Sequence, residues 1–211
     1  MQNRTINENN PYHSTAGDYE RKLSLPIVSA IRRQESATIN SLIERYVGPD
    51  CRALEIGPGT GFYTRALAQA CREVVAVEDA TEMADILREK LAAHSNVTVL
   101  NNDFRALPTD DKFEVVMAIG VLDYISEPAA FVDKMCGLAT KAVIFTTPHR
   151  SFWGWVFSTG SKLHKINVYC RGCDTVAEWV PSGWQCATAL EVGLKTPLTR
   201  GMTLIVALEP Q

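Results

Sequence analysis

The stretch that decides the fold is Glu55-Ile-Gly-Pro-Gly-Thr-Gly61, a glycine-rich segment between a short apolar run and a helical pattern. Its alternate glycines can adopt backbone angles closed to other residues, and they let a ligand lie against the main chain. Such a turn between a strand and a helix suits many nucleotide-like ligands. The spacing G-x-G-x-G differs from the dinucleotide fingerprint G-x-G-x-x-G, and no Gly-Lys-Ser/Thr follows, which excludes a P-loop.

Acidic residues stand at the ends of the next two expected strands. The run 74–78 ends in Glu78, and the run 97–100 is soon followed by Asp103. A carboxylate at the first of these strand tips can accept hydrogen bonds from both hydroxyls of an unphosphorylated ribose, and it would repel the phosphate of NADP. The second can accept from an adenine amino group. Because ligands of open α/β sheets bind at the carboxyl ends of the strands, these side chains are expected to converge.

Short apolar runs alternate with helical patterns through the middle of the chain. Strands separated by helices favour right-handed crossovers and a mostly parallel sheet, and near-continuous apolar strands are typical of a sheet covered on both faces. The expected strands are 52–56, 74–78, 97–100, 113–119, 142–146, 188–192 and 201–208, and the expected helices are 19–46, 64–70, 81–93 and 127–135. Thr81 suits the N-cap of the third helix. The last two strands are too close for an intervening helix, so they are expected to pair as an antiparallel hairpin.

Composition excludes several classes of protein. A chain of 211 residues with 46% hydrophobic and 21% charged residues fits one globular domain, and it is neither disordered nor collagen-like. The net charge of −3 gives no basic footprint of a nucleic-acid reader. Six cysteines are too few for a disulfide scaffold, and no secretory signal or transmembrane segment is visible. A cytoplasmic protein with reduced thiols is expected, without stable insertion into a membrane.

Four motifs in order resemble those of the class I S-adenosylmethionine-dependent methyltransferases. They are ALEIGPGTGFYTRALA, VVAVEDATEM, NVTVLNNDFRALP and FEVVMAIGVLDYI, followed by a helix and an IFTTP strand. The resemblance covers residues 50–148. It implies S-adenosylmethionine as the cofactor. It also implies an α/β fold of the Rossmann-like, doubly wound kind, with a seven-stranded, mostly parallel sheet, an antiparallel final strand and helices on both faces.

The resemblance also implies roles for individual residues. Glu55 and the glycine-loop backbone would hold the methionine amino and carboxylate end, Glu78 the ribose hydroxyls, and Asp103 the adenine amino group. The other positions that it places around the cofactor are Tyr19, Gly57, Gly59, Thr60, Gly61, Asp79, Met83, Phe104, Ile119 and Gly120. Structural alternatives are an exposed strand residue for Glu55, plain helix packing for Met83 and a core anchor for Tyr19.

Three residues are candidates for catalysis. Methyl transfer from a sulfonium mainly requires that the protein position the acceptor and exclude water, and a general base is needed only when the acceptor carries a proton. His149 follows the fifth strand, and histidine is a side chain suited to act as a base at neutral pH. Asp123 and Tyr124 follow the fourth strand. A polar loop role for His149 and a capping or solvent role for Asp123 are the alternatives.

The segment after the fourth strand bears on the substrate. It reads Ile119-Gly-Val-Leu-Asp-Tyr124, without the Asn/Asp-Pro-Pro-Tyr or Asn-Leu-Pro-Tyr motif of methyltransferases that act on nucleic-acid bases. The predicted partner is therefore a small-molecule substrate, methylated on oxygen, nitrogen or carbon, and no nucleic acid. The protein is expected to be a monomer or homodimer. The alternative functions are a non-catalytic cofactor-binding module that serves a partner, and a methyltransferase acting on lipid at a membrane surface.

The predicted organisation is a single domain, 1–211. It comprises an N-terminal helical cap (1–48), a cofactor-binding core (49–147), a substrate lid (148–174) and a terminal helix with the hairpin (175–211). The aromatic stretch FWGWVF within the lid segment is suited to exclude water from a substrate, with a partner-facing or lipid-facing surface as the alternative.

A lone C-x-x-C, Cys170-Arg-Gly-Cys173, follows the aromatic stretch. A zinc site needs two further ligands, and the spacing of His149 and His164 fits no known zinc knuckle. No metal site is therefore predicted.

Overall fold

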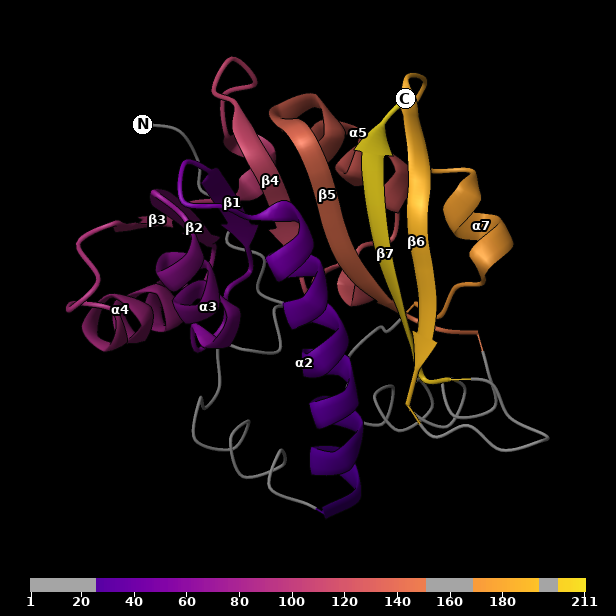
Figure 1. Ribbon diagram of the computed structural model, residues 1–211, viewed down its shortest axis with the longest axis horizontal. Helices are drawn as coiled ribbons and strands as arrows, with labels where there is room; N and C mark the ends of the chain where they lie inside the picture. Colours follow the sequence, from indigo (N-terminus) through magenta and orange to yellow (C-terminus); the bar gives the residue numbers. More distant parts are fainter. Residues whose placement is uncertain (1–25, 151–168, 194–200) are drawn as a thin grey trace.

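The computed structural model describes residues 26–150, 169–193 and 201–211, and only the backbone of residues 26–31. One seven-stranded sheet has the order β3-β2-β1-β4-β5-β7-β6 (Figure 1). Its strands are β1 (Arg52–Ile56), β2 (Glu73–Glu78), β3 (Val97–Asn101), β4 (Phe113–Ala118), β5 (Ala139–Pro148), β6 (Trp184–Val192) and β7 (Thr203–Pro210). The described helices are α2 (Pro26–Tyr46), α3 (Phe62–Ala70), α4 (Thr81–Lys90), α5 (Pro128–Leu138) and α7 (Cys173–Ala177), with 3-10 turns η2 (Phe104–Ala106) and η3 (Leu122–Tyr124).

Strand directions confirm the predicted topology. β3, β2, β1, β4 and β5 pair in parallel, whereas β7 runs antiparallel to both β5 and β6. The final strand therefore lies inside the sheet between β5 and β6, and the sheet is doubly wound and mostly parallel. The carboxyl ends of the parallel strands meet at one edge, where the glycine-rich turn follows β1.

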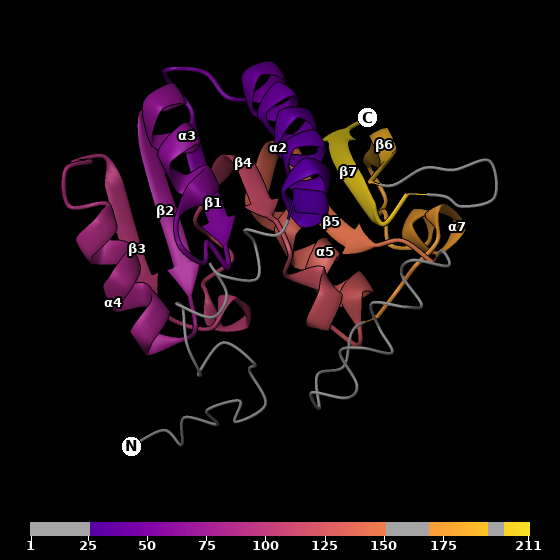
Figure 2. The ribbon, with the colours of Figure 1, turned by 90° about the horizontal axis from the view of Figure 1, so that it is seen from below.

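Alternate residues of the central strands serve two separate cores. On one face, Val115 and Met117 of β4 cluster with Ile43 of α2 and Leu67 of α3. On the other face, Val116 clusters with buried side chains of α5 and α7. Figure 2 shows the helices in two layers on either side of the sheet. Burial on both faces explains why the strands are apolar at nearly every position.

α2 crosses one face of the sheet (Figure 1). Its buried side chains recur at helical spacing, and they are Ile39, Leu42, Ile43 and Tyr46. The Tyr46 hydroxyl donates to Glu209 of β7 at 3.2 Å, and Lys141 of β5 donates to the Tyr46 carbonyl at 2.7 Å. The C-terminal end of the helix is thereby tied to β5 and β7. Among the described residues, no helix combines the length and apolar character needed to cross a bilayer.

Local predictions need correction at one helix start and two strands. Thr81 is not an N-cap: Ala80 occupies that position, and the Thr81 hydroxyl donates to Asn101 Oδ1 at 3.0 Å. The register of β2 and β3 pairs Glu78 with Asn101, so a contact between neighbouring strand tips replaces the local cap. β5 is longer than predicted because it pairs with β4 at its start and with β7 at its end, and β6 is longer because it pairs with β7 along its length. The aromatic stretch of the predicted lid lies within 151–168, outside the described residues.

Candidate functional site

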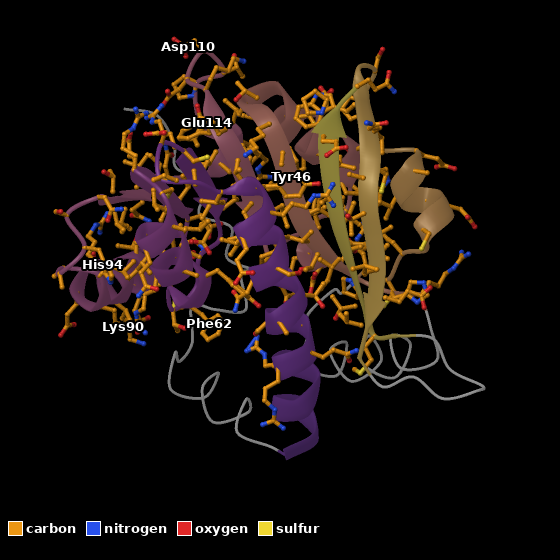
Figure 3. The ribbon with its side chains drawn as sticks, viewed as in Figure 1. Tyr46, Phe62, Lys90, His94, Asp110 and Glu114 are labelled. Carbon is orange, nitrogen blue, oxygen red and sulfur yellow. The ribbon has the colours of Figure 1, made fainter. Side chains whose placement is uncertain are left out.

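The candidate site lies at the carboxyl edge of the sheet, where β1, β2 and β4 end. Phe62, the first residue of α3, marks this edge in Figure 3, and Asp110 and Glu114 lie toward the opposite end of the sheet. Three strand tips bring their following loops together here. The side chains that sequence reasoning assigned to the cofactor therefore come from separate segments of one edge.

The glycine loop after β1 is a turn whose backbone favours glycine at three positions. Gly57, Gly59 and Gly61 have φ angles of 62°, 55° and 79°, in the left-handed region that favours glycine. A Cβ at Gly57 would lie 2.6 Å from Val121 Cγ2, and one at Gly61 would lie 2.6 Å from Leu87 Cδ1. At Gly59 a Cβ would meet no described atom within 4 Å. Packing therefore requires the outer two glycines, whereas the middle one leaves its backbone accessible.

Glu55 is a buried carboxyl group beneath this loop. It is 2% exposed, so the exposed-strand alternative is wrong. Its Oε2 atom and the hydroxyl of the buried Thr64 have no hydrogen-bond partner among the described residues. Burial raises the pKa of Glu55 to about 7; the nearby Thr64 hydroxyl acts to lower this pKa, and the charge of Glu78 acts to raise it. Because an unpaired buried acceptor is costly, these two oxygens suit a ligand that donates hydrogen bonds.

Glu78 forms the tip of β2. Its Oε1 atom accepts from the Ala80 backbone N–H at 3.0 Å, which fixes the carboxyl group over the start of α4. Burial raises the pKa of Glu78 to about 7, and the charge of Asp79 adds to this effect. The Asn101 amide donates to the backbone carbonyls of Glu78 at 2.9 Å and Asp79 at 3.2 Å. The tips of β2 and β3 are thereby held together.

Asp103 begins η2 and is engaged by an arginine that sequence reasoning missed. Arg105 donates from Nε to Oδ1 at 3.0 Å and from Nη2 to Oδ2 at 2.8 Å. Burial acts to raise the pKa of Asp103, but the hydrogen bonds and charge of Arg105 outweigh it and lower this pKa. The next residue, Phe104, is buried against Phe131, with ring centroids 4.7 Å apart. Asp103 therefore stays ionised as an acceptor.

The segment after β4 closes the site on the side of β5. Gly120 has a φ of 72°, and its N–H donates to Thr146 Oγ1 of β5 at 2.8 Å. Asp123 lies on η3, next to Tyr124, and its Oδ1 atom is buried without a partner among the described residues. Burial raises the pKa of Asp123 to about 7, and the charge of Glu35 on α2 acts in the same direction. A carboxyl group with this pKa can exchange protons at neutral pH.

Arg171 fixes η3 from outside the cofactor motifs. Its Nη1 atom donates to the carbonyls of Leu122 and Tyr169, both at 3.0 Å. Its guanidinium lies over the Trp179 ring, 5.2 Å from the centroid. The Tyr169 N–H in turn donates to the Asp123 carbonyl at 2.9 Å. These hydrogen bonds hold the stretch around Arg171 against the turn that carries Asp123. No local sequence pattern predicted this role for Arg171.

His149, the predicted base, has its neighbours on β6 and α7. It is 2% exposed, and its Nε2 atom lies 3.5 Å from Glu191 Oε1 of β6. Its Nδ1 atom is buried without a partner among the described residues. Cys173 is the third member of the same group. The structure therefore gathers His149 with Glu191 and Cys173, whereas Asp123 and Tyr124 share η3.

The remaining predicted cofactor residues vary in exposure. Thr60 and Ile119 are half-buried and Asp79 is exposed. Met83 is 4% exposed on α4, which is compatible with both the packing and the cofactor role. Tyr19 lies outside the described residues.

Two cavities in the described part of the chain lie elsewhere. One of about 310 Å³ is lined by residues of α4, β3 and the loop between them, among them Leu91 and Val97. The other, of about 170 Å³, is lined by Leu100, Leu107, Phe113 and neighbouring residues. Neither contains any of the buried unpartnered atoms, so the strand tips remain the best-supported site.

Comparison with known proteins agrees with this geometry. Residues 53–141 match a family model described as a methyltransferase domain. The chain is 46% identical over 72 residues to an rRNA adenine N-6-methyltransferase of Saccharopolyspora erythraea, covering 34% of this chain and 19% of that protein. It is 24% identical over 160 residues to a ubiquinone biosynthesis O-methyltransferase of Bordetella parapertussis, covering 72% and 65%. The matches thus span less than two thirds of either relative.

A solved structure shows the same fold over nearly the whole chain. The magnesium protoporphyrin IX methyltransferase of Synechocystis PCC 6803 with bound SAH has a TM-score of 0.76 and 18% identity, and the match covers 96% of this chain and 98% of that one. The predicted resemblance is confirmed: residues 53–141 carry a methyltransferase domain of the S-adenosylmethionine-dependent class, on a Rossmann-like fold.

One prediction about partners is wrong. The absence of a basic footprint and of the base-methylating motif led to the exclusion of nucleic acid as a partner. The relative from Saccharopolyspora erythraea acts on rRNA by its name, and further rRNA methyltransferases occur among the similar proteins and solved structures. Net charge averages over the whole surface, so it cannot exclude a nucleic-acid partner for a chain with such relatives.

Proposed function

We propose that the whole chain is an S-adenosylmethionine-dependent methyltransferase that acts on an oxygen or nitrogen atom of a small molecule. The observation that carries this proposal is the buried carboxyl group of Glu55 beside the glycine loop, whose Oε2 atom has no hydrogen-bond partner among the described residues, with Glu78 at the adjoining strand tip. The cofactor carries an ammonium and a sulfonium cation. Buried carboxylates suit cations because each compensates the lost hydration of the other.

The residues at the strand tips fit this cofactor. Glu55 and Thr64 would accept hydrogen bonds from its amino group, and the Gly59 backbone would face its carboxylate. Glu78 would accept from the ribose hydroxyls and Asp103 from the adenine amino group. When bound, S-adenosylmethionine would supply a methyl group for in-line transfer to an acceptor oxygen or nitrogen, with S-adenosylhomocysteine as the leaving group.

Residues of η3 would act on the acceptor. With a pKa of about 7, Asp123 is partly ionised at neutral pH, so its buried Oδ1 atom can take a proton from a hydroxyl or ammonium group. Glu35 favours this by making the Asp123 carboxylate more basic. Tyr124, the next residue on η3, would help to position the acceptor. Hydroxyl and ammonium groups are acceptors that lose a proton on methylation, so a base at this position supports O- or N-methylation.

The same turn supports a small acceptor. In place of a base-methylating motif, residues 120–124 form a compact turn whose Leu122 carbonyl accepts from Arg171. The nearby Ile125 carbonyl accepts from the same guanidinium. Ribosomal RNA is the competing acceptor suggested by the relatives.

A labelling experiment distinguishes these acceptors. The purified full chain is incubated with methyl-labelled S-adenosylmethionine and one of two fractions of a single cell extract. The fractions are the small-molecule filtrate and the ribosomal RNA. We expect label in the small-molecule fraction, and far less of it with Asp123→Asn. Label only in RNA would overturn the small-molecule proposal. Cofactor binding without transfer to either fraction would overturn the enzymatic role and favour a binding module.

A further inference from the structure

A second group of chemically active side chains lies outside the cofactor motifs. It consists of His149 at the end of β5, Cys173 at the start of α7 and Glu191 near the end of β6. One ligand atom from each lies within 4.8 Å of the others. We propose that these three side chains form a binding site for a divalent transition metal, with Zn²⁺ as the best match to its ligands.

The backbone holds the three segments together. The His149 N–H donates to the Met202 carbonyl at 2.8 Å, next to the start of β7. Arg171 forms a parallel bridge with His149, in which its own N–H donates to the Pro148 carbonyl at 2.8 Å. Cys173 follows two residues later, and Glu191 lies on β6, which pairs with β7. The three side chains are thus brought together by secondary structure rather than by chance surface proximity.

The distances are close to those of a metal site. Two ligands that each lie about 2.0–2.1 Å from a tetrahedral zinc are about 3.4 Å apart, and His149 Nε2 lies 3.5 Å from Glu191 Oε1. A thiolate about 2.3 Å from the metal lies about 3.6 Å from the other ligands. The three ligand atoms lie within 4.8 Å of one another, so the Cys173 sulfur would have to approach the other two ligands by no more than about 1.2 Å. The exposed Cys173 side chain can make this approach by rotation.

Burial supports a ligand at this position. The His149 Nδ1 atom is buried and has no hydrogen-bond partner among the described residues, an arrangement that costs free energy in the absence of a ligand. A metal bound to Nδ1 would give this atom its missing partner, whereas a metal bound to Nε2 would orient the imidazole toward Glu191. Imidazole nitrogen, thiolate sulfur and carboxylate oxygen together form a ligand set that zinc accepts.

The group leaves one position of a tetrahedral metal for water or a ligand from solution. Three protein ligands and one open position are typical of reactive zinc sites rather than of closed structural ones. A metal-bound imidazole has no lone pair for proton transfer at the coordinated nitrogen. His149 is therefore a metal ligand, and the role of general base stays with Asp123. The metal site does not depend on the proposed methyl transfer.

Cobalt(II) titration of the purified full chain, stripped of metal with a chelator, tests the proposal. Cobalt coordinated by a thiolate gives a sulfur-to-metal charge-transfer absorption that carboxylate and imidazole ligands do not give. We expect this band to saturate at one cobalt per chain and to be displaced by zinc. Cys173→Ser should abolish it and weaken zinc binding by about 100-fold, which is the upper end of the loss caused by removing an outer-sphere partner.

Matched variants keep the result interpretable. Cys186→Ser removes an exposed cysteine of β6 that is not in the group, and it should bind cobalt like the wild type. Glu191→Gln should keep the band but weaken binding. Zinc should raise the melting temperature of the wild type and of Cys186→Ser but not of Cys173→Ser. No saturable cobalt band in the wild type, or an unchanged band in Cys173→Ser, would overturn the proposal. S-adenosylmethionine binding by Cys173→Ser shows separately whether the cofactor site is intact.

Discussion

Three carboxyl groups, those of Glu55, Glu78 and Asp123, have pKa values of about 7 because the fold removes them from water. Their ordinary values are 4.5 for glutamate and 3.8 for aspartate. Between those values and pH 7, the native state keeps protons that the unfolded chain has released. The stability of the cofactor-free protein therefore falls as pH rises through this window, and above pH 7 the loss is complete. A cationic ligand would offset this loss because it favours the ionised forms.

The same pKa values predict that cofactor affinity depends on pH. Glu55 must release its proton to pair with the cofactor's ammonium group, so binding weakens below pH 7. For one such carboxyl group, the affinity should be about 20-fold lower at pH 5.5 than at pH 7.5. Calorimetry at both pH values, in buffers of different ionisation enthalpy, also counts the protons released. Glu55→Gln should bind more weakly at pH 7.5 and show a smaller pH dependence. An affinity that does not change between these pH values would contradict the assignment.

If Asp123 is the general base, a single substitution at this residue should slow methyl transfer without weakening cofactor binding. Asp123→Asn keeps the size of the side chain but cannot take a proton, so the rate of methyl transfer should fall by about 100- to 10,000-fold. The dissociation constant of the cofactor should change by less than about twofold. Wild-type activity should rise with pH through about 7, and the variant should lack this rise. Asp133→Asn, an exposed position on α5, is the control and should be fully active. Equal loss of cofactor binding and activity in Asp123→Asn would indicate a structural role instead.

At the scale of elements, the strands and the glycine loop could be predicted because their signals are local. Apolar runs, helical spacing and alternate glycines each depend on residues a few positions apart. The Thr81 cap was wrong because the contact that replaced it joins neighbouring strand tips. Arg171 and Glu191 were missed for the same reason: their partners, Leu122 and His149, lie more than forty positions away and meet them only in the folded chain.

The glycine loop gives a test of stability at this scale. Gly61→Ala would place a Cβ 2.6 Å from Leu87 Cδ1 at a φ of 79°, so we expect it to destabilise the protein by about 1–3 kcal/mol. Gly137→Ala lies in α5, where an added Cβ meets no described atom within 4 Å. It should be neutral or stabilise the protein by up to about 1 kcal/mol. Urea unfolding followed by circular dichroism measures both. Equal stability of the two variants would show that the loop does not need glycine at Gly61.

Across the whole molecule, the two groups of functional side chains lie on different strands of the sheet. The tips of β1, β2 and β4 carry the residues assigned to the cofactor, whereas the ends of β5 and β6 carry the histidine–cysteine–glutamate group. β7 lies between β5 and β6, and its antiparallel insertion is what brings Glu191 of β6 near the end of β5. The first group could be predicted from motifs, but the second depends on this inserted strand.

Calorimetric titration of the purified full chain with S-adenosylmethionine at pH 7.5 tests most directly whether the strand tips bind the cofactor. We predict one cofactor per chain for the wild type. Glu78→Ala removes the acceptor for the ribose hydroxyls, and it should weaken binding by at least about 30-fold, as expected for charged hydrogen bonds worth about 2 kcal/mol. Glu82→Ala, an exposed glutamate of α4, should bind like the wild type. No detectable binding by the wild type, or wild-type affinity in Glu78→Ala, would show that these strand tips are not the cofactor site.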